Sequence, residues 1–102
     1  MKLELSNEKI IDVIRVVKGG MMDYLHIYIN SLSPAEMYEI FDHNPEATKV
    51  IKVIENSGEE EIVHVYAGYT ELYSIQKPFL KSPEGTWMVW MQRPTEVITD
   101  VS

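Results

Sequence analysis

The sequence has no cysteine among its 102 residues, so disulfides, thiolate metal ligands and cysteine nucleophiles are excluded. It has no apolar run near the roughly 20 residues that a membrane-spanning helix needs, and its first residues lack the apolar core of a signal peptide. Basic residues are few, with 9 Lys and Arg against 16 Asp and Glu, which gives a net charge of −7. Such a chain is poorly suited to hold nucleic-acid phosphates over a broad face. We therefore expect neither a membrane nor a nucleic acid as a direct partner.

The composition is otherwise that of a globular protein. Apolar residues make up 45% of the chain, which is too high for intrinsic disorder. The length fits one domain, because two domains of half this size would each be marginally stable. We predict a single compact domain over residues 1–95 and a frayed C-terminal tail over residues 96–102.

The negative charge is concentrated in residues 21–61. This segment holds nine acidic and two basic residues, whereas the segments on either side of it are nearly neutral. Four of the acids form a candidate acidic patch: Glu55, Glu59, Glu60 and Glu61. Either these residues belong to a solvated surface with an acidic turn, or they form an anionic patch that meets a basic partner or mimics nucleic-acid phosphate.

The first 30 residues contain patterns typical of strands. Residues 2–5 alternate as a half-buried strand does, and residues 21–30 place three aliphatic side chains on one face and aromatic side chains on the other. Residues 8–17 are ambiguous, because polar side chains recur at helical spacing while β-branched residues are dense. The Gly19-Gly20 pair that follows is typical of a hairpin turn, so we interpret Ile10–Val17 as a strand.

One helix is predicted over residues 33–43. Ser33 and Glu36 have the spacing of a capping box, with Pro34 at the first helical position. An apolar stripe follows at helical spacing, and Pro45 disfavours helical geometry in the residue before it. Residues 45–47 can add one further turn.

The C-terminal half indicates β-structure. Strand patterns cover residues 48–55, 61–67, 69–76 and 86–92, with a turn at 56–58, a break at Gly68 and a proline-containing loop at 78–85. The last of these strands is apolar on both faces, which is typical of a central strand or one covered by a partner. The sequence therefore predicts an α+β fold: six to seven mostly antiparallel strands in a curved sheet or two-layer sandwich, with one main helix at about 33–43.

No established catalytic or metal-binding motif is present. The sequence lacks a Gly-x-Ser-x-Gly elbow, a phosphate-binding loop and a paired-glycine dinucleotide motif, and it has three histidines. Glu39, Asp42 and His43 cluster at the end of the predicted helix, but their spacing is not that of a zinc protease. A histidine near a helix C-terminus is electrostatically favourable without a metal. We predict a non-enzymatic protein with no metal and no cofactor.

Aromatic strand faces are the main candidates for binding. His26 and His64 each lie on the more aromatic face of a predicted strand, and these rings form one surface if the two strands are neighbours. Rings with polar tips suit protein contacts, because they bury area at low entropic cost. The alternative is that the rings pack as a second layer under the helix or across a sandwich. The candidate partner-binding residues are Tyr24, His26, Tyr28, His64, Tyr66 and Trp90.

Three short segments resemble the layout of small phage- or prophage-encoded proteins of Gram-positive bacteria. These segments are Leu32–Phe41, Asn44–Thr48 and Tyr66–Leu72, followed by a final strand that ends at Pro94. The resemblance implies a virion, tail or assembly accessory, or an early protein that binds a host factor. It carries over no catalytic residue.

Three functional hypotheses follow. The first is a non-enzymatic protein–protein interaction protein of phage or prophage origin, acting through a sheet face or an open strand edge and able to self-associate. The second is an acidic inhibitor of a host nucleic-acid-binding protein. The third is a small-ligand-binding or enzymatic domain that uses the His and Tyr strand faces. The first two imply a location in the host cytoplasm or in the virion.

Overall fold

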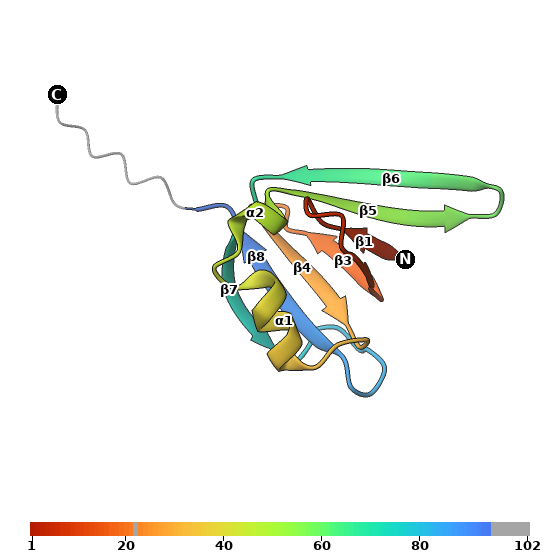
Figure 1. Cartoon of the computed structure of the whole chain (residues 1–102). Helices are drawn as coiled ribbons and strands as arrows, with labels where there is room; N and C mark the ends of the chain where they lie inside the picture. Colours follow the sequence, from red (N-terminus) through yellow and green to blue (C-terminus); the bar gives the residue numbers. More distant parts are fainter. Residues whose placement is uncertain (22, 95–102) are drawn as a thin grey trace, which may run out of the picture.

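The computed structural model describes residues 1–21 and 23–94 (Figure 1). Within these residues, eight strands form two four-stranded antiparallel sheets, with strand orders β2-β1-β5-β6 and β3-β4-β8-β7. The α+β fold with two layers of antiparallel strands is confirmed. The predicted tail at 96–102 lies outside the described residues. The strands are β1 (Lys2–Glu4), β2 (Ile10–Asp12), β3 (Arg15–Lys18), β4 (Tyr24–Ile29), β5 (Val50–Ser57), β6 (Glu60–Ala67), β7 (Glu71–Gln76) and β8 (Trp87–Gln92).

The segment predicted as one strand over Ile10–Val17 is two strands, which lie in different sheets. The change of sheet falls between two consecutive residues: the Val13 N–H donates to the Met1 carbonyl, and the Ile14 N–H donates to the Tyr28 carbonyl. The β-branched residues favour extended backbone here, as predicted. The prediction of a single strand was wrong. This short segment joins the two sheets, and its hydrogen-bond partners lie in other segments of the chain.

The predicted helix is α1 (Pro34–Phe41). Its capping box is present, because the Glu36 N–H donates to the Ser33 hydroxyl over 3.3 Å and the Ser33 N–H donates to the Glu36 carboxylate over 3.2 Å. The further turn expected after Pro45 is α2 (Pro45–Thr48).

The core lies between the two sheets and beneath α1 (Figure 1). Alternate residues of β4 and β8 point toward it, as the alternation of apolar residues in the sequence predicts. Its fully buried side chains include Leu3 and Ile51 from the first sheet, Ile27 and Val89 from the second, and Phe41 from α1. Burial of each such side chain contributes roughly 1.5–3 kcal/mol, so this layer supplies most of the stability.

The β5–β6 hairpin extends well beyond the rest of the first sheet (Figure 1). Strand β1 pairs only with Lys52–Ile54 of β5, so the distal half of the hairpin is a two-stranded ribbon. Its turn lies at Gly58-Glu59, slightly later than the predicted turn at 56–58. Gly58 has a φ of +64°, a conformation that glycine adopts without a steric penalty.

Candidate interaction surfaces

Strand β6 is an exposed edge of the first sheet. It pairs with β5 on one side and is the last strand in the sheet order. Three of its apolar side chains are exposed, with relative accessibilities of 40% for Ile62, 46% for Val63 and 58% for Val65. Ile62 lies on one face of the strand and the two valines lie on the other. The strand thus presents apolar atoms on both faces and, between them, a backbone edge that pairs with no other strand in the described residues.

The backbone groups that point outward from this edge can be assigned. The Gly68 N–H donates to the Lys49 carbonyl over 2.9 Å, so the opposed pair Val50 and Ala67 exchanges no backbone hydrogen bonds of its own. The Ala67 N–H and C=O therefore point away from β5. Because the pattern alternates along an antiparallel ladder, the same holds for Val63 and Val65.

The inner face of the hairpin continues the protein core outward. Ile51 lies opposite Tyr66, Val53 opposite His64, and Glu55 opposite Ile62. Tyr66 packs against the core, whereas Ile62 lies beyond it. The His64 Nε2 atom is 3.4 Å from a carboxylate oxygen of Glu55, and both side chains are about half exposed. Apolar contacts therefore decrease along the hairpin, from its buried base to its exposed tip.

Three of the four acids of the predicted acidic patch lie at the hairpin tip. Glu59, Glu60 and Glu61 are exposed in and beside the turn, and Glu55 lies on the adjoining strand. Glu55 lies opposite Ile62 and contacts His64, so it is set back from the turn. A cluster of like charges raises the local negative potential, which favours contact with a basic surface.

A second surface is an aromatic cluster on the outer face of the sheet formed by β3, β4, β8 and β7. The Tyr24 and His26 rings stack at 4.4 Å between centroids, and the Trp90 ring lies 4.5 Å from His26 and 5.1 Å from Tyr24. These residues occupy the face opposite to the core-facing Leu25, Ile27 and Val89. The cluster combines three of the predicted binding residues.

Two members of this aromatic cluster, Tyr73 and Phe79, were not predicted from the sequence. The Tyr73 ring lies 4.7 Å from Trp90, and the Phe79 ring lies 5.7 Å from His26. Tyr73 sits at a register shift in β7, between Leu72 and Ser74, which disrupts the regular alternation. Phe79 belongs to a loop that lies over this face, and a loop carries no periodic signal from which such a contact can be predicted.

Two buried nitrogen atoms of the aromatic cluster are notable. Among the described residues, His26 Nε2 and Trp90 Nε1 are buried without a hydrogen-bond partner. Burial lowers the pKa of His26, because the charged imidazolium loses hydration there. His26 and Tyr28 are only 7% and 1% exposed, so both belong to the interior rather than to an accessible surface.

The two histidines of the predicted aromatic surface do not meet. His26 lies on β4 and His64 lies on β6, and these strands belong to different sheets. Tyr66 also lies away from the aromatic cluster and contacts Tyr69 instead, with the ring centroids 6.3 Å apart. The single surface that required neighbouring strands is therefore not formed. Sequence alternation assigns faces within one strand and carries no information about strand order.

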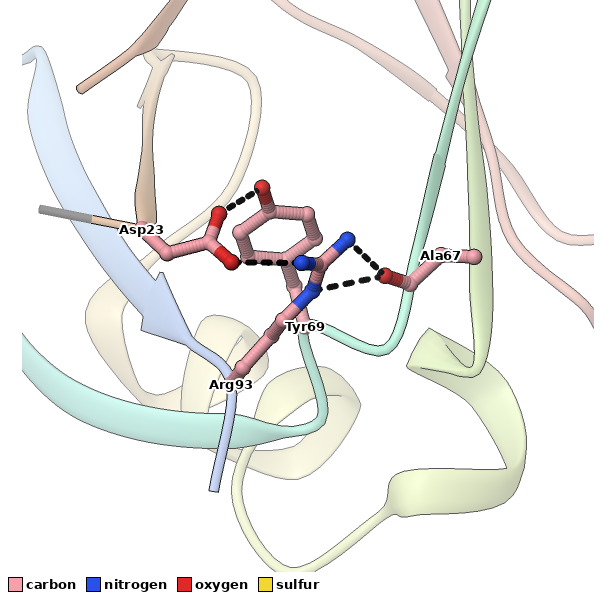
Figure 2. A network of polar contacts seen from close by, with 4 residues as sticks. All are labelled: Asp23, Ala67, Tyr69 and Arg93. Carbon is pink, nitrogen blue, oxygen red and sulfur yellow. Dashed lines mark hydrogen bonds and ion pairs between the residues drawn. The ribbon is translucent and has the colours of Figure 1, made fainter. Parts of the chain in front are cut away.

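A polar network fastens the base of the hairpin to the second sheet (Figure 2). The Tyr69 hydroxyl donates to one carboxylate oxygen of Asp23, and Arg93 Nη1 donates to the other over 2.5 Å. Arg93 also donates from Nε and Nη2 to the Ala67 carbonyl over 3.2 and 3.1 Å. These contacts join the residue before β4, the residue after β8 and the end of β6.

The network shifts the pKa values of its members. The hydrogen bond from Tyr69 and the positive charge of Arg93 lower the pKa of Asp23, although partial burial opposes them. Burial, together with the hydrogen bond to Asp23, raises the pKa of Tyr69 to about 12. Every polar group in the network has a partner within the chain, so we assign it a structural role.

The end of α1 does not form a metal site in the described part of the chain. No group of three His, Asp or Glu side chains there has suitable geometry. The His43 Nε2 atom lies 3.5 Å from the Asp42 carboxylate, and His43 itself is almost fully exposed. Two open depressions, of about 490 and 250 Å³, lie beside residues 4–8 and beside residues 42–45, away from the aromatic cluster.

Neither helix in residues 1–21 and 23–94 is long and apolar enough to cross a membrane. Comparison of the chain with protein-family models, curated proteins and solved structures finds no match.

Proposed function

We propose that the chain is a non-enzymatic protein–protein interaction protein whose contact surface is the open edge of β6. One observation carries this proposal: an eight-residue edge strand that exposes Ile62, Val63 and Val65 on its two faces. Unpaired backbone groups at such an edge accept a further strand, and the neighbouring side chains supply specificity.

Proteins usually protect their edge strands against pairing with other chains. Charged residues, prolines and bulges along an edge prevent unwanted pairing. Strand β6 has no proline, and its acidic residues occupy only the end nearest the tip. A two-stranded ribbon is also marginally stable in water, so its distal half gains most from a third strand.

The biological setting belongs to the same proposal. The resemblance of Leu32–Phe41, Asn44–Thr48 and Tyr66–Leu72 to phage- and prophage-encoded proteins supports a virion or assembly accessory. Such a protein acts in the host cytoplasm or within the virion.

A matched pair of variants tests the surface. Val65→Lys places a charge on the proposed edge, and Ile10→Lys places one on β2, at the opposite edge of the same sheet. The two side chains are equally exposed, at 58% and 57%. Capture of proteins from host and virion lysates on the tagged chain should lose its specific partner with Val65→Lys and retain it with Ile10→Lys. Equal capture by both variants contradicts the proposal.

The acidic tip favours the inhibitor as a second candidate function. Neutralising Glu59, Glu60 and Glu61 to Gln should then weaken binding to a basic host protein and reduce the salt dependence of that binding. Unchanged affinity after this substitution removes the inhibitor hypothesis.

The third hypothesis finds no support in the geometry. It requires His26 and His64 within one cleft, and their strands lie in different sheets. Among the described residues, neither open depression is lined by His26, His64, Tyr24 or Tyr66.

A further inference from the structure

We propose that the occupant of the β6 edge is a second copy of this chain, with the two β6 strands antiparallel about a twofold axis at His64. The two first sheets then form one continuous eight-stranded sheet. This inference rests on the proposed function, because it names the partner of the same edge.

The choice of β6 follows from the other sheet edges in the described structure. Strands β2 and β3 have three and four residues, and β7 carries a register shift. Strand β6 has eight residues and pairs with β5 without a shift. Figure 1 shows its outer side free of other labelled elements. It is therefore the longest and most regular of the four edges.

The backbone hydrogen bonds fit a twofold arrangement. The outward-pointing groups belong to Val63, Val65 and Ala67, and by the same alternation to Glu61. Centring the pairing on His64 places Val63 opposite Val65 of the second copy, and Glu61 opposite Ala67 of the second copy. Each of these pairs joins two residues whose backbone groups both point outward. The Val63–Val65 pairs can exchange both backbone hydrogen bonds, whereas the Glu61–Ala67 pairs can form one each, from the Ala67 N–H, because Arg93 already holds the Ala67 carbonyl.

The side chains in this register match on both faces. On the outer face, each Val63 meets the other copy's Val65, beside Ile54, which lies opposite Val63 within the hairpin. On the inner face, each Ile62 meets the other copy's Tyr66, which packs against that copy's core. The three exposed apolar side chains of β6 are thus covered together. Such cross-strand pairs are a main source of stabilisation between neighbouring strands.

The charges also favour the antiparallel arrangement. The acids Glu60 and Glu61 lie at the tip end of β6, and Arg93 holds the Ala67 carbonyl at the other end. Antiparallel pairing brings each pair of acids beside the other copy's Arg93. A parallel arrangement in register instead places identical acids side by side, which is destabilising.

Disulfide trapping tests the register directly, because the full chain has no cysteine of its own. In the proposed dimer, His64 lies opposite its own copy in a pair that shares no backbone hydrogen bonds. The Cα atoms of such a pair are about 4.5 Å apart, within the range that a disulfide requires. We therefore expect His64→Cys to oxidise to a covalent dimer at least about tenfold faster than Ile62→Cys, because pairing raises the effective concentration of facing thiols.

Two further measurements test whether the covalent dimer forms through the β6 edge. Adding Val65→Lys to His64→Cys should slow dimer formation to the rate of Ile62→Cys, whereas adding Ile10→Lys should leave it unchanged. Sedimentation of the unmodified chain over roughly 1–500 μM should show a monomer–dimer equilibrium, since a contact of one strand pair is a weak interface. A monomer throughout this range overturns the inference, as does equally fast trapping of Ile62→Cys.

The outcomes also separate this inference from the proposed function. A monomeric chain that still loses a captured host or virion protein with Val65→Lys has an edge occupied by a different partner. In that case the self-pairing is wrong and the proposed function stands. A monomeric chain whose capture is unaffected by Val65→Lys contradicts both.

Discussion

Strands β4 and β6 share a local sequence pattern and differ completely in environment. Each contains an aliphatic residue, a histidine, a β-branched residue and a tyrosine in that order, at residues 25–28 and 63–66. In β4 all four side chains are buried, whereas in β6 only the tyrosine is even partly buried. The difference follows from position, because β4 has a strand on each side and β6 is an edge. The same pattern is therefore buried in one sheet and largely exposed in the other.

The largest expected effect comes from truncating equivalent positions in the two strands. Ile27→Ala removes a side chain that is fully buried, and should lower the free energy of unfolding by about 2–5 kcal/mol. Val65→Ala removes an exposed side chain, and should change it by less than about 0.5 kcal/mol at concentrations where the chain is monomeric. Urea denaturation of both variants measures the difference. A similar decrease in the free energy of unfolding for both variants would mean that Val65 is buried within the monomer.

Alkaline pH should weaken the network that joins β6 to the second sheet. The raised pKa of Tyr69 means that the folded state holds the proton of the Tyr69 hydroxyl more tightly than the unfolded state does. The resulting stability is fully present below the unfolded-state value of about 10 and is lost as pH rises toward about 12. This difference in the pKa of Tyr69 between the folded and unfolded states corresponds to about 3 kcal/mol of stability. Denaturation at pH 8 to 12 should show this loss in the unmodified chain and a smaller loss in Tyr69→Phe. Identical profiles would contradict the structural role of the network.

The same network should act at acidic pH. Because the pKa of Asp23 is lowered in the folded state, its contribution is present above the unfolded-state value and is lost as pH falls below about 4. Asp23→Asn should destabilise the chain at pH 7 and flatten the dependence on pH between 5 and about 3. Thermal unfolding across this range is the measurement, with Glu59→Gln, at the exposed tip, as the control. If both variants give the same profile, the contacts of Asp23 contribute nothing to the folded state.

The smallest effect is expected inside the aromatic cluster. His26→Phe keeps a ring between Tyr24 and Trp90 and removes a buried nitrogen that has no partner. Replacing a buried unpaired polar group by an apolar one of similar shape should be neutral or stabilising by up to about 1 kcal/mol at pH 7. Because burial lowers the pKa of His26, the unmodified chain should lose stability below about pH 6.5, and the variant should lose less. A clear destabilisation at pH 7 would show that His26 has a partner in solution.

The features that the sequence predicted well are those determined by neighbouring residues. The capping box of Ser33 and Glu36, the turn after Pro45 and the alternating faces of β4 and β8 depend on spacing alone. The central position of β8 also agrees with its apolar residues on both faces.

The features that were missed depend on contacts between distant segments. The break in Ile10–Val17 arises because Val13 and Ile14 bond to opposite sheets. The separation of His26 from His64 depends on strand order, which alternation does not specify. The acidic patch was predicted as a set of residues, but its place at the tip of an extended hairpin depends on how little of β5 is covered by β1.

The most direct test of the account is amide hydrogen exchange along β6. The Val63 and Val65 N–H groups point to the open edge, whereas the His64 N–H points to β5 and serves as an internal reference. In dilute solution, Val63 and Val65 should exchange rapidly and His64 slowly. At concentrations where the chain associates, the two valine amides should become at least about tenfold better protected, while amides of β2 and β7 should be unchanged. Association that leaves the valine amides unprotected would contradict the assignment of β6 as the contact surface.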